Sequence, residues 1–241
     1  MSEHLDVAVL GAGTAGLNAM GQTRRHTRNF LLIDGAPEDE LGTTCARVGC
    51  MPSKALIHVA ESFHARKQFH KLGIEGGDAL SIDTSATMER VQDVRDILVD
   101  RVLGNSIDKM GDKFRNEYAR FVDAHTLQVG DQTLTADKVV IATGSRPIVP
   151  AAWQELGDQV LTTDSFFEQE ELPATMAVIG LGVIGLELGQ ALAQLGVQVT
   201  GIDALTTIAG ITDPEINRNA IDLVQKDFPL ILGESAQLEK S

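Results

Sequence analysis

The sequence predicts an α/β protein made of two Rossmann-like dinucleotide-binding modules, each a three-layer arrangement around a parallel sheet, with a small antiparallel meander in addition. A Gly-x-Gly-x-x-Gly pattern follows a short apolar strand at residues 11–16, and the same pattern recurs at residues 180–185. In both copies a helix and a second apolar strand follow, and that strand ends at an aspartate, Asp34 or Asp203. The first glycine and the aspartate are 23 positions apart in each copy (34 − 11 and 203 − 180). Equal spacing argues against chance.

The composition excludes several classes of function. The chain has 241 residues, of which 43% are hydrophobic, and 34 acidic against 20 basic residues give a net charge of −14. A strongly acidic balance argues against a surface for nucleic acid or anionic membranes. No apolar run approaches the roughly 18 residues of a membrane span, and no signal or transit peptide precedes the first strand. We therefore expect a cytoplasmic protein, a setting in which a close cysteine pair is more often catalytic than structural.

The first module begins with an apolar strand at residues 5–10 and continues through the glycine pattern into a helix and the strand 30–33. Glycines at these places permit a tight turn and let a pyrophosphate approach the helix N-terminus, and the carboxylate takes the ribose hydroxyls. The candidate dinucleotide-binding residues of this module are Gly11, Gly13, Thr14, Ala15, Gly16 and Asp34.

The only two cysteines, Cys45 and Cys50, follow this module. Five positions of a regular helix would separate their Cα atoms by roughly 8 to 9 Å, which exceeds the limit of about 7 Å for a disulfide. We expect Gly49 to bend the backbone between them. Pro52 suits the first turn of a helix that would place Cys50 at its positive end with Lys54 nearby, and both effects favour a thiolate. From the pair alone, ordinary buried thiols or a static disulfide remain alternatives. A zinc site is disfavoured because no four-ligand set is present.

Two helical segments follow. The first covers residues 53–70 and carries His58, His64 and His70, but a six-residue interval turns about 240° on a helix, so we interpret them as solvated side chains and predict no metal site. The second, at residues 85–115, has apolar residues at helical spacing and no visible site.

The period then changes to that of strands, at residues 119–122, 126–129, 132–134 and 138–142, with a turn at Gly130. The last of these strands ends at a Thr-Gly pair, and residues 146–174 form a crossing into the second module. There the sequence predicts strands at 176–179 and 197–202 on either side of an apolar-striped helix. We assign residues 1–147 to an FAD-binding domain that carries the cysteine pair and residues 148–241 to an incomplete NAD-binding domain.

Two dinucleotide sites beside a redox-active dithiol require a link between hydride transfer and thiol-disulfide exchange, and a flavin supplies it. The flavin belongs with the cysteines in the first module. In the second, Asp203 would accept the 2′-hydroxyl of NAD, and residues 204–210 contain no Arg or Lys to neutralise a 2′-phosphate. NAD is therefore favoured over NADP.

Across essentially the whole chain, the sequence resembles the class I flavoprotein (pyridine nucleotide) disulfide reductases, and among them the dihydrolipoamide dehydrogenases. The motifs that carry the resemblance are the two cysteines, the Pro-Ser-Lys that follows them, and Ala-Thr-Gly-Ser-Arg-Pro at residues 142–147. The resemblance implies that Cys45 is the interchange thiol and Cys50 the charge-transfer thiol, and that Lys54 lies near the flavin and pairs with Glu187. Besides the first glycine pattern, the residues that it implies for FAD are Thr43, Thr44, Lys54, Ala119, Ala142, Thr143, Gly144 and Ser145. Those for NAD are Gly180, Gly182, Val183, Ile184, Gly185, Glu187 and Asp203.

The implied activity is oxidation of a dihydrolipoyl dithiol, with electrons passing through the cysteine pair and FAD to NAD. The implied partner is a lipoyl-bearing protein or a small dithiol or disulfide substrate. The sequence departs from the family in three places. Asp34 stands where glutamate is usual, Ala46 and Arg47 replace the usual Leu-Asn, and Val183 occupies the position of a tyrosine gate in glutathione-reductase-like relatives. Val183 thus favours the dihydrolipoamide type, whereas Ala46 and Arg47 leave the substrate open, so a glutathione- or mercuric-reductase-like activity is an alternative.

The resemblance also implies a homodimer in which the C-terminal domain of the partner supplies a catalytic histidine-glutamate pair. None of the six histidines has a matching context, so we expect a truncated chain that retains FAD weakly and turns over lipoamide slowly. A flavin-binding redox or interaction module without turnover is the alternative from another class.

Overall fold

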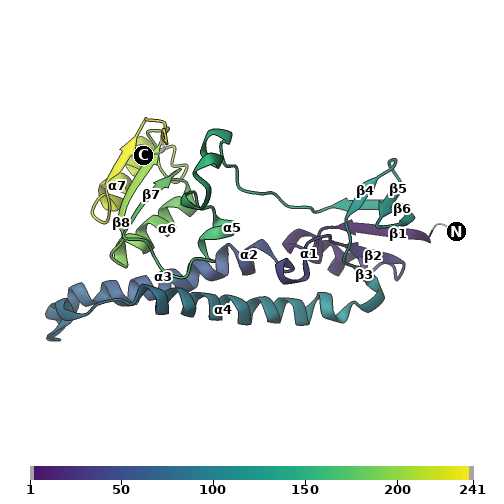
Figure 1. Cartoon of the computed structure of the whole chain (residues 1–241), viewed down its shortest axis with the longest axis horizontal. Coiled ribbons are helices and arrows are strands. Elements are labelled where there is room, and N and C mark those ends of the chain that lie inside the picture. Colours follow the sequence, from purple (N-terminus) through teal and green to yellow (C-terminus); the bar gives the residue numbers. More distant parts are fainter. Residues whose placement is uncertain (1–2, 239–241) are drawn as a thin grey trace. The chain divides into compact units, whose positions relative to one another are not determined.

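The computed structural model describes residues 3–238, and the chain divides into two compact units. One unit consists of Met1–Met51 and Arg95–Ile148, and the other of Pro52–Val94 and Val149–Ser241. Residues 52–94 thus pack with the second fingerprint, whereas the sequence places them in the first domain. Each unit has its own sheet (Figure 1).

The first unit is built on a six-stranded sheet in which β1, β2, β3 and β6 are parallel and β4 and β5 are antiparallel additions to β6. The strand order is β3-β2-β1-β6-β5-β4. The elements are β1 (Glu3–Leu10), α1 (Thr14–Thr23), β2 (Phe30–Ile33), β3 (Phe114–Arg115), β4 (Ala119–Phe121), β5 (Thr126–Val129) and β6 (Gln132–Ile141).

One strand was predicted as two. The sequence suggests separate strands at 132–134 and 138–142, but β6 is continuous because it serves two neighbours. Its first residues pair antiparallel with β5, and Leu134 to Ile141 pair in parallel with β1. The predicted meander is therefore part of the same sheet.

The core of this unit lies on both faces of the sheet. All four residues of β2 are buried, which is typical of a central parallel strand. Along β1, Ala8 and Leu10 belong to one buried cluster, whereas Val9 belongs to another, as the alternation of a strand requires.

The two predicted long helices are shorter than expected, and short 3-10 segments follow them. Cys50–His64 is α3, continued by the 3-10 helix η2 (Ala65–Leu72), which ends at Gly73 in the left-handed region, φ +76°. Thr84–Asn105 is α4. The hydroxyl of Ser106 donates to the carbonyl of Val102, a local bond that competes with continued helix. The remaining short elements are η1 (Glu38–Glu40), α2 (Thr44–Arg47), η3 (Gly77–Ala79), η4 (Ile107–Lys109) and η5 (Gly111–Lys113).

The second unit contains a three-stranded parallel sheet in the order β7-β8-β9. The sequence analysis did not include its last helix and strand, although Asp213 caps the helix through the backbone N–H groups of Glu215 and Ile216, a recognisable start pattern. The elements are η6 (Ala151–Gln159), α5 (Thr163–Phe166), β7 (Thr175–Ile179), α6 (Val183–Gln194), β8 (Gln198–Asp203), α7 (Pro214–Val224) and β9 (Leu230–Leu232).

Residues 52–94 join the second unit through its apolar core. Leu56 of α3 and Met88 of α4 are fully buried in the same cluster as Phe166 and Phe167. The two rings meet edge to face with centroids 5.0 Å apart, a favourable aromatic geometry. The Gln92 amide donates to the carbonyls of Phe167 and Gln169, which adds polar links to the same contact.

No helix in the described part of the chain is long and apolar enough to cross a membrane.

The third glycine of each fingerprint is fixed by a close approach of backbone. A Cβ on Gly16 would lie 1.7 Å from the carbonyl oxygen of Gly11, and one on Gly185 would lie 2.0 Å from that of Gly180. Around Gly13, in contrast, no atom lies within 4 Å of the position a Cβ would take. Glycine is therefore required at Gly16 and at Gly13 for different reasons.

We predict that Gly16→Ala lowers the free energy of unfolding by about 1–3 kcal/mol, because the methyl group must displace main chain. The matched variant Gly13→Ala changes it by less than about 0.5 kcal/mol, since a poorer helix cap is offset by a less flexible unfolded chain. Urea unfolding of both variants measures the difference. Equal midpoints for the two variants would contradict the close approach at Gly16.

Candidate functional site

The first fingerprint forms a turn whose open side is lined by backbone. Gly11 has φ +101°, in the region that favours glycine, and its N–H donates to the carbonyl of Ile33 at 2.7 Å. Gly13 is the N-cap of α1, so Thr14 and Ala15 form the first helical turn. The open space at Gly13 is the kind of cradle that a pyrophosphate requires, since a side chain there would fill it. The residues present therefore fit a dinucleotide.

Asp34 holds this turn in place. One carboxylate oxygen accepts the N–H of Ala12 at 2.6 Å and the other accepts the N–H of Ala36 at 2.9 Å. From the sequence we expect Asp34 to accept hydrogen bonds from ribose hydroxyls. A carboxylate has about four lone-pair sites, so acceptor capacity for a ribose remains after these two bonds.

The segment after β6 lies against the same turn. The Ala142 N–H donates to the carbonyl of Leu10 at 2.8 Å, and a Cβ on Gly11 would lie 2.2 Å from the Ala142 oxygen and 3.2 Å from the Thr143 Cα. The structure thus brings Ala142 and Thr143 next to the fingerprint. Gly144 follows with φ +71° and no neighbour at its Cβ position, and Ser145 comes directly after it.

Ala119 does not join this group through the sheet, because β4 is at the opposite edge from β2 and β3 and Ala119 pairs with Val129. Its neighbour Tyr118 reaches the site instead. The ring carbons of Tyr118 lie 2.5–2.7 Å from the position of a Cβ on Gly35. The side chain is 71% exposed, so it presents an aromatic surface beside Asp34.

Asn116 is a second residue that the sequence analysis did not single out. Its amide donates to the carbonyls of Asp34 and Ala36 at 2.8 and 2.7 Å and so fixes the backbone after β2. The available sequence signals were weak: one asparagine before a short strand and the single tyrosine of the chain.

The cysteine pair spans a break between two helices, as the sequence predicts. Cys45 is in α2, α3 begins at Cys50, and Gly49 lies in the break. A Cβ on Gly49 would be 2.9 Å from the Thr44 carbonyl oxygen, which explains the glycine. Thr43 caps α2 by accepting the Ala46 N–H at 3.0 Å. Pro52 occupies the first turn of α3.

The two thiols have different surroundings. No disulfide joins them in the described structure; Cys45 is half-buried and Cys50 is exposed. Burial raises the pKa of the Cys45 thiol, and the side-chain hydrogen bond with Cys50 and the charge of that group raise it further, against a smaller opposite effect of a backbone hydrogen bond from Cys50. Cys45 therefore remains a thiol to higher pH than an ordinary cysteine.

In the second unit the fingerprint repeats this geometry. Gly180 has φ +95° and Gly182 is the N-cap of α6. Asp203 accepts the N–H of Leu181 at 2.6 Å and that of Leu205 at 2.8 Å. At the start of α6, where a dinucleotide phosphate would approach, Val183 and Ile184 are 59% and 63% exposed.

Lys54 and Glu187 form the predicted ion pair, with Nζ 2.8 Å from Oε2. Both side chains are partly exposed, so the pair contributes little to stability, about 0–1 kcal/mol. The pair borders a cavity of about 430 Å³ between α3 and α6. The cavity is lined by Lys54, Ile57, His58, Glu61, Glu187, Gln190, Ala191 and Gln194.

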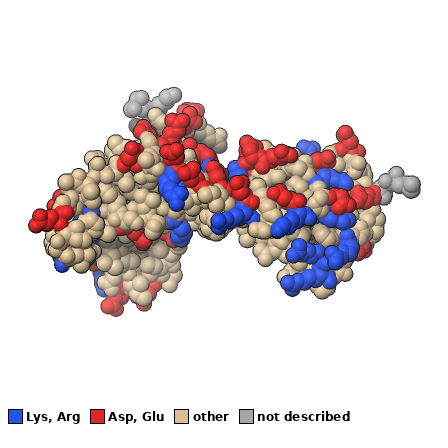
Figure 2. Space-filling view, turned by 90° about the horizontal axis from the view of Figure 1, so that it is seen from below, with Lys and Arg blue, Asp and Glu red and all other residues tan. Residues whose placement is uncertain are grey.

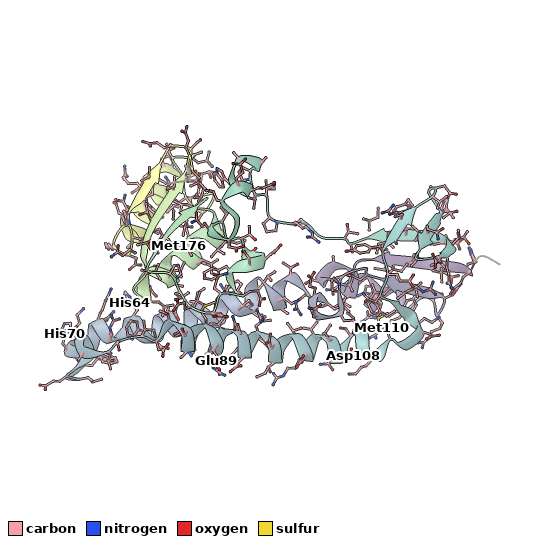
Figure 3. The ribbon with its side chains drawn as sticks, viewed as in Figure 1. His64, His70, Glu89, Asp108, Met110 and Met176 are labelled. Atoms are coloured by element: carbon pink, nitrogen blue, oxygen red, sulfur yellow. The ribbon has the colours of Figure 1, made fainter. Side chains whose placement is uncertain are left out.

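The three histidines after the cysteines lie on successive elements, His58 and His64 on α3 and His70 on η2. Figure 3 labels His64 and His70. His58 and His70 are exposed, as expected. The prediction for His64 was wrong, because this residue is half-buried and its enclosed Nδ1 has no hydrogen-bond partner among residues 3–238.

Charge is unevenly distributed over the surface. Acidic side chains spread over both units, whereas lysine and arginine gather on part of the first unit (Figure 2). The net charge of −14 is therefore not a uniform property of the surface.

Among curated proteins, dihydrolipoyl dehydrogenase from Bacillus subtilis is 30% identical and the match covers 94% of this chain and 49% of that protein. Dihydrolipoyl dehydrogenase 3 from Pseudomonas aeruginosa is 34% identical, over 90% of this chain and 47% of the relative. Mercuric reductase from Lysinibacillus sphaericus is 27% identical, over 96% and 42%. The chain thus spans about half the length of the curated relatives that it matches.

Among solved structures, the HOCl-induced flavoprotein disulfide reductase RclA from Escherichia coli superimposes with a TM-score of 0.76 at 23% identity, over 95% of this chain and 49% of that one. At this identity the likeness concerns the fold. The family model described as pyridine nucleotide-disulphide oxidoreductase matches residues 5–232. The chain therefore belongs to this family of oxidoreductases, which use FAD together with a nicotinamide nucleotide.

Proposed function

We propose that the chain carries the electron-transfer half of a dihydrolipoyl dehydrogenase, with FAD at the fingerprint of residues 1–147, NAD at that of residues 148–241, and Cys45 and Cys50 as the exchanging thiols. The observation that carries the proposal is the hydrogen-bonded contact of the two cysteines across the break between α2 and α3. Relatives named dihydrolipoyl dehydrogenase at 30–34% identity support the choice of dithiol.

In the oxidised protein the pair is a disulfide. A thiolate of the dihydrolipoyl group attacks Sγ of Cys45, the Cys45–Cys50 bond breaks, and Cys50 leaves as a thiolate. The second substrate thiol then displaces Cys45, which closes the lipoyl disulfide and leaves two reduced cysteines. Two electrons and two protons have moved from the substrate to the chain. FAD, when bound, supplies the two-electron acceptor that connects the reduced pair to NAD.

Several residues would position these groups. Gly13, Gly144 and the first turn of α1 leave room for the FAD pyrophosphate, and Tyr118 offers an aromatic surface beside Asp34. The Lys54 ammonium, held by Glu187, would place a fixed positive charge where the family resemblance locates the flavin. We also propose three further residues as part of the FAD site, on the family resemblance alone: Thr43, Thr44 and Ser145.

The mercuric reductase relative favours a second candidate activity. The residues between the cysteines, Ala46 and Arg47, differ from those usual in dihydrolipoamide dehydrogenases, and they lie beside the thiol that would meet the substrate. A disulfide reductase acting on glutathione disulfide or on Hg²⁺ would use the same pair.

We also propose that the whole protein acts as a homodimer on a lipoyl-bearing partner. The reducing cytoplasm is the compartment in which a reversible cysteine pair of this kind functions.

We predict that the oxidised chain, which lacks two titratable thiols, regains both when it is treated with dihydrolipoamide, and that one lipoamide forms per chain. Thiol titration and the mass gain of 2 hydrogens, about 2 Da, measure this exchange without any cofactor, since thiol-disulfide exchange needs only the two sulfurs and a substrate thiolate. The control Cys50→Ser has no disulfide for the substrate to open, so it should gain no thiols and form no lipoamide. If glutathione disulfide oxidises the reduced chain tenfold or more faster than lipoamide does, the second candidate replaces the first.

A further prediction concerns Cys45. Because its pKa is raised, its alkylation by iodoacetamide should reach half its maximal rate above the ordinary thiol value of about 8.5. In Cys50→Ala the midpoint should fall, since the hydrogen bond and charge of the neighbour are removed, yet stay above the ordinary value because burial is the largest cause. Peptide mass spectrometry follows each cysteine separately. A midpoint at or below the ordinary value in the intact chain would show that burial does not control this thiol.

We predict that the chain binds NADH at least about tenfold more tightly than NADPH, because the Asp203 carboxylate would repel a 2′-phosphate and residues 204–210 provide no basic side chain. Fluorescence titration with both nucleotides measures the ratio. Asp203→Asn, which removes the charge and keeps one acceptor oxygen, should bring the affinities for NADH and NADPH closer together. Equal affinities in the unmodified chain would remove the argument for NAD.

A further inference from the structure

His4, Asp6 and Asp137 form a group of possible metal ligands at the amino-terminal end of the first sheet. β1 and β6 are parallel with His4 opposite Thr135 and Leu5 opposite Ala136. Because side chains alternate along a strand, His4 and Asp6 share one face with Thr135 and Asp137. One ligand atom from each of the three residues lies within 4.8 Å of the others.

The group is distant from the dinucleotide site. The fingerprint begins at Gly11, after the carboxyl end of β1, and Asp6 is five residues earlier on the same strand. At about 3.3 Å per residue, roughly 16 Å of strand separates them. An ion bound by this group would therefore be separate from the cofactor chemistry.

Other side chains orient the ligands. Nδ1 of His4 is 3.1 Å from the Thr135 hydroxyl, which leaves Nε2 directed at Asp137. Asp6 accepts hydrogen bonds from the Thr27 hydroxyl and from the Asn29 amide, the latter at 3.1 Å. Hydrogen bonds of this kind fix the orientation of ligands in metal sites.

The separation of two of these ligand atoms fits a shared metal ion. Nε2 of His4 and Oδ1 of Asp137 are 3.4 Å apart. Two ligand atoms that each lie about 2.0–2.1 Å from a tetrahedral ion are about 3.3–3.4 Å from one another. One imidazole and two carboxylates form a nitrogen-oxygen set that Zn²⁺ and similar transition ions accept, whereas Ca²⁺ and Mg²⁺ prefer oxygen alone.

We propose that His4, Asp6 and Asp137 bind a divalent transition-metal ion of the zinc class, with water in the remaining position. Bound there, the ion would link the first half of β1 to the middle of β6. It would stabilise the folded chain by mass action, because the ligands come together only when the sheet is formed.

The experiment is a titration of the full chain with Zn²⁺, followed by calorimetry and by the thermal midpoint. His4→Ala and Asp137→Asn should each weaken this binding at least about tenfold, since each removes one of three protein ligands. His26→Ala is the matched control, an exposed histidine of the same unit outside the group, and should bind as the unmodified chain does. Zinc bound by Cys45 and Cys50 is common to all four proteins and cancels in the comparison.

We expect zinc to raise the thermal midpoint of the unmodified chain and of His26→Ala by more than that of His4→Ala or Asp137→Asn. His4 and Asp137 are exposed, so we expect both variants to fold; if one does not, the other gives the result. Identical isotherms for the unmodified chain and either folded ligand variant would overturn the proposal.

Discussion

The bond between a carboxylate at the end of one strand and the backbone of the preceding glycine turn shapes both units. Asp34 accepts the N–H of Ala12, and Asp203 accepts that of Leu181, each at 2.6 Å. This hydrogen bond holds the turn in place. The third glycine lets the following helix pack against the carbonyl oxygen of the first glycine. Both constraints act on main chain, so backbone contacts set the shape of the cradle, and the open acceptor positions of the aspartate remain for the ribose.

The parts of the fold that local chemistry determines could be predicted from the sequence. The glycine turns, the buried strand β2 and the helix break at Gly49 each follow from a backbone requirement of a few adjacent residues. Three other features could not be predicted: the length of β6, the ends of α3 and α4, and the packing of Pro52–Val94 against the rest of the second unit. They depend on partners far away in the chain, such as β1 or Phe166.

The candidate site divides in the same way. Lys54 and Glu187 are 133 positions apart, and the family resemblance, not their spacing, predicts their pairing. Asn116 and Tyr118 join the Asp34 turn only because the chain crosses it between β3 and β4, which no local pattern indicates. The enclosed nitrogen of His64 is likewise a product of packing, so its polarity alone suggested a solvated side chain.

The different surroundings of the two thiols bear on the direction of exchange. In oxidation of a dithiol, the substrate thiolate attacks Cys45 as part of a disulfide, so a raised pKa of that group does not slow the first step. The sulfur that must leave is Cys50, at the first position of α3. The reverse reaction would need Cys45 itself as the attacking thiolate, and its burial opposes that step. Cys45 is also the sulfur that leaves when the lipoyl disulfide closes, so its raised pKa opposes that step of oxidation as well as the matching attack in reduction. A group that exchanges a proton with Cys45 would therefore speed the exchange in both directions.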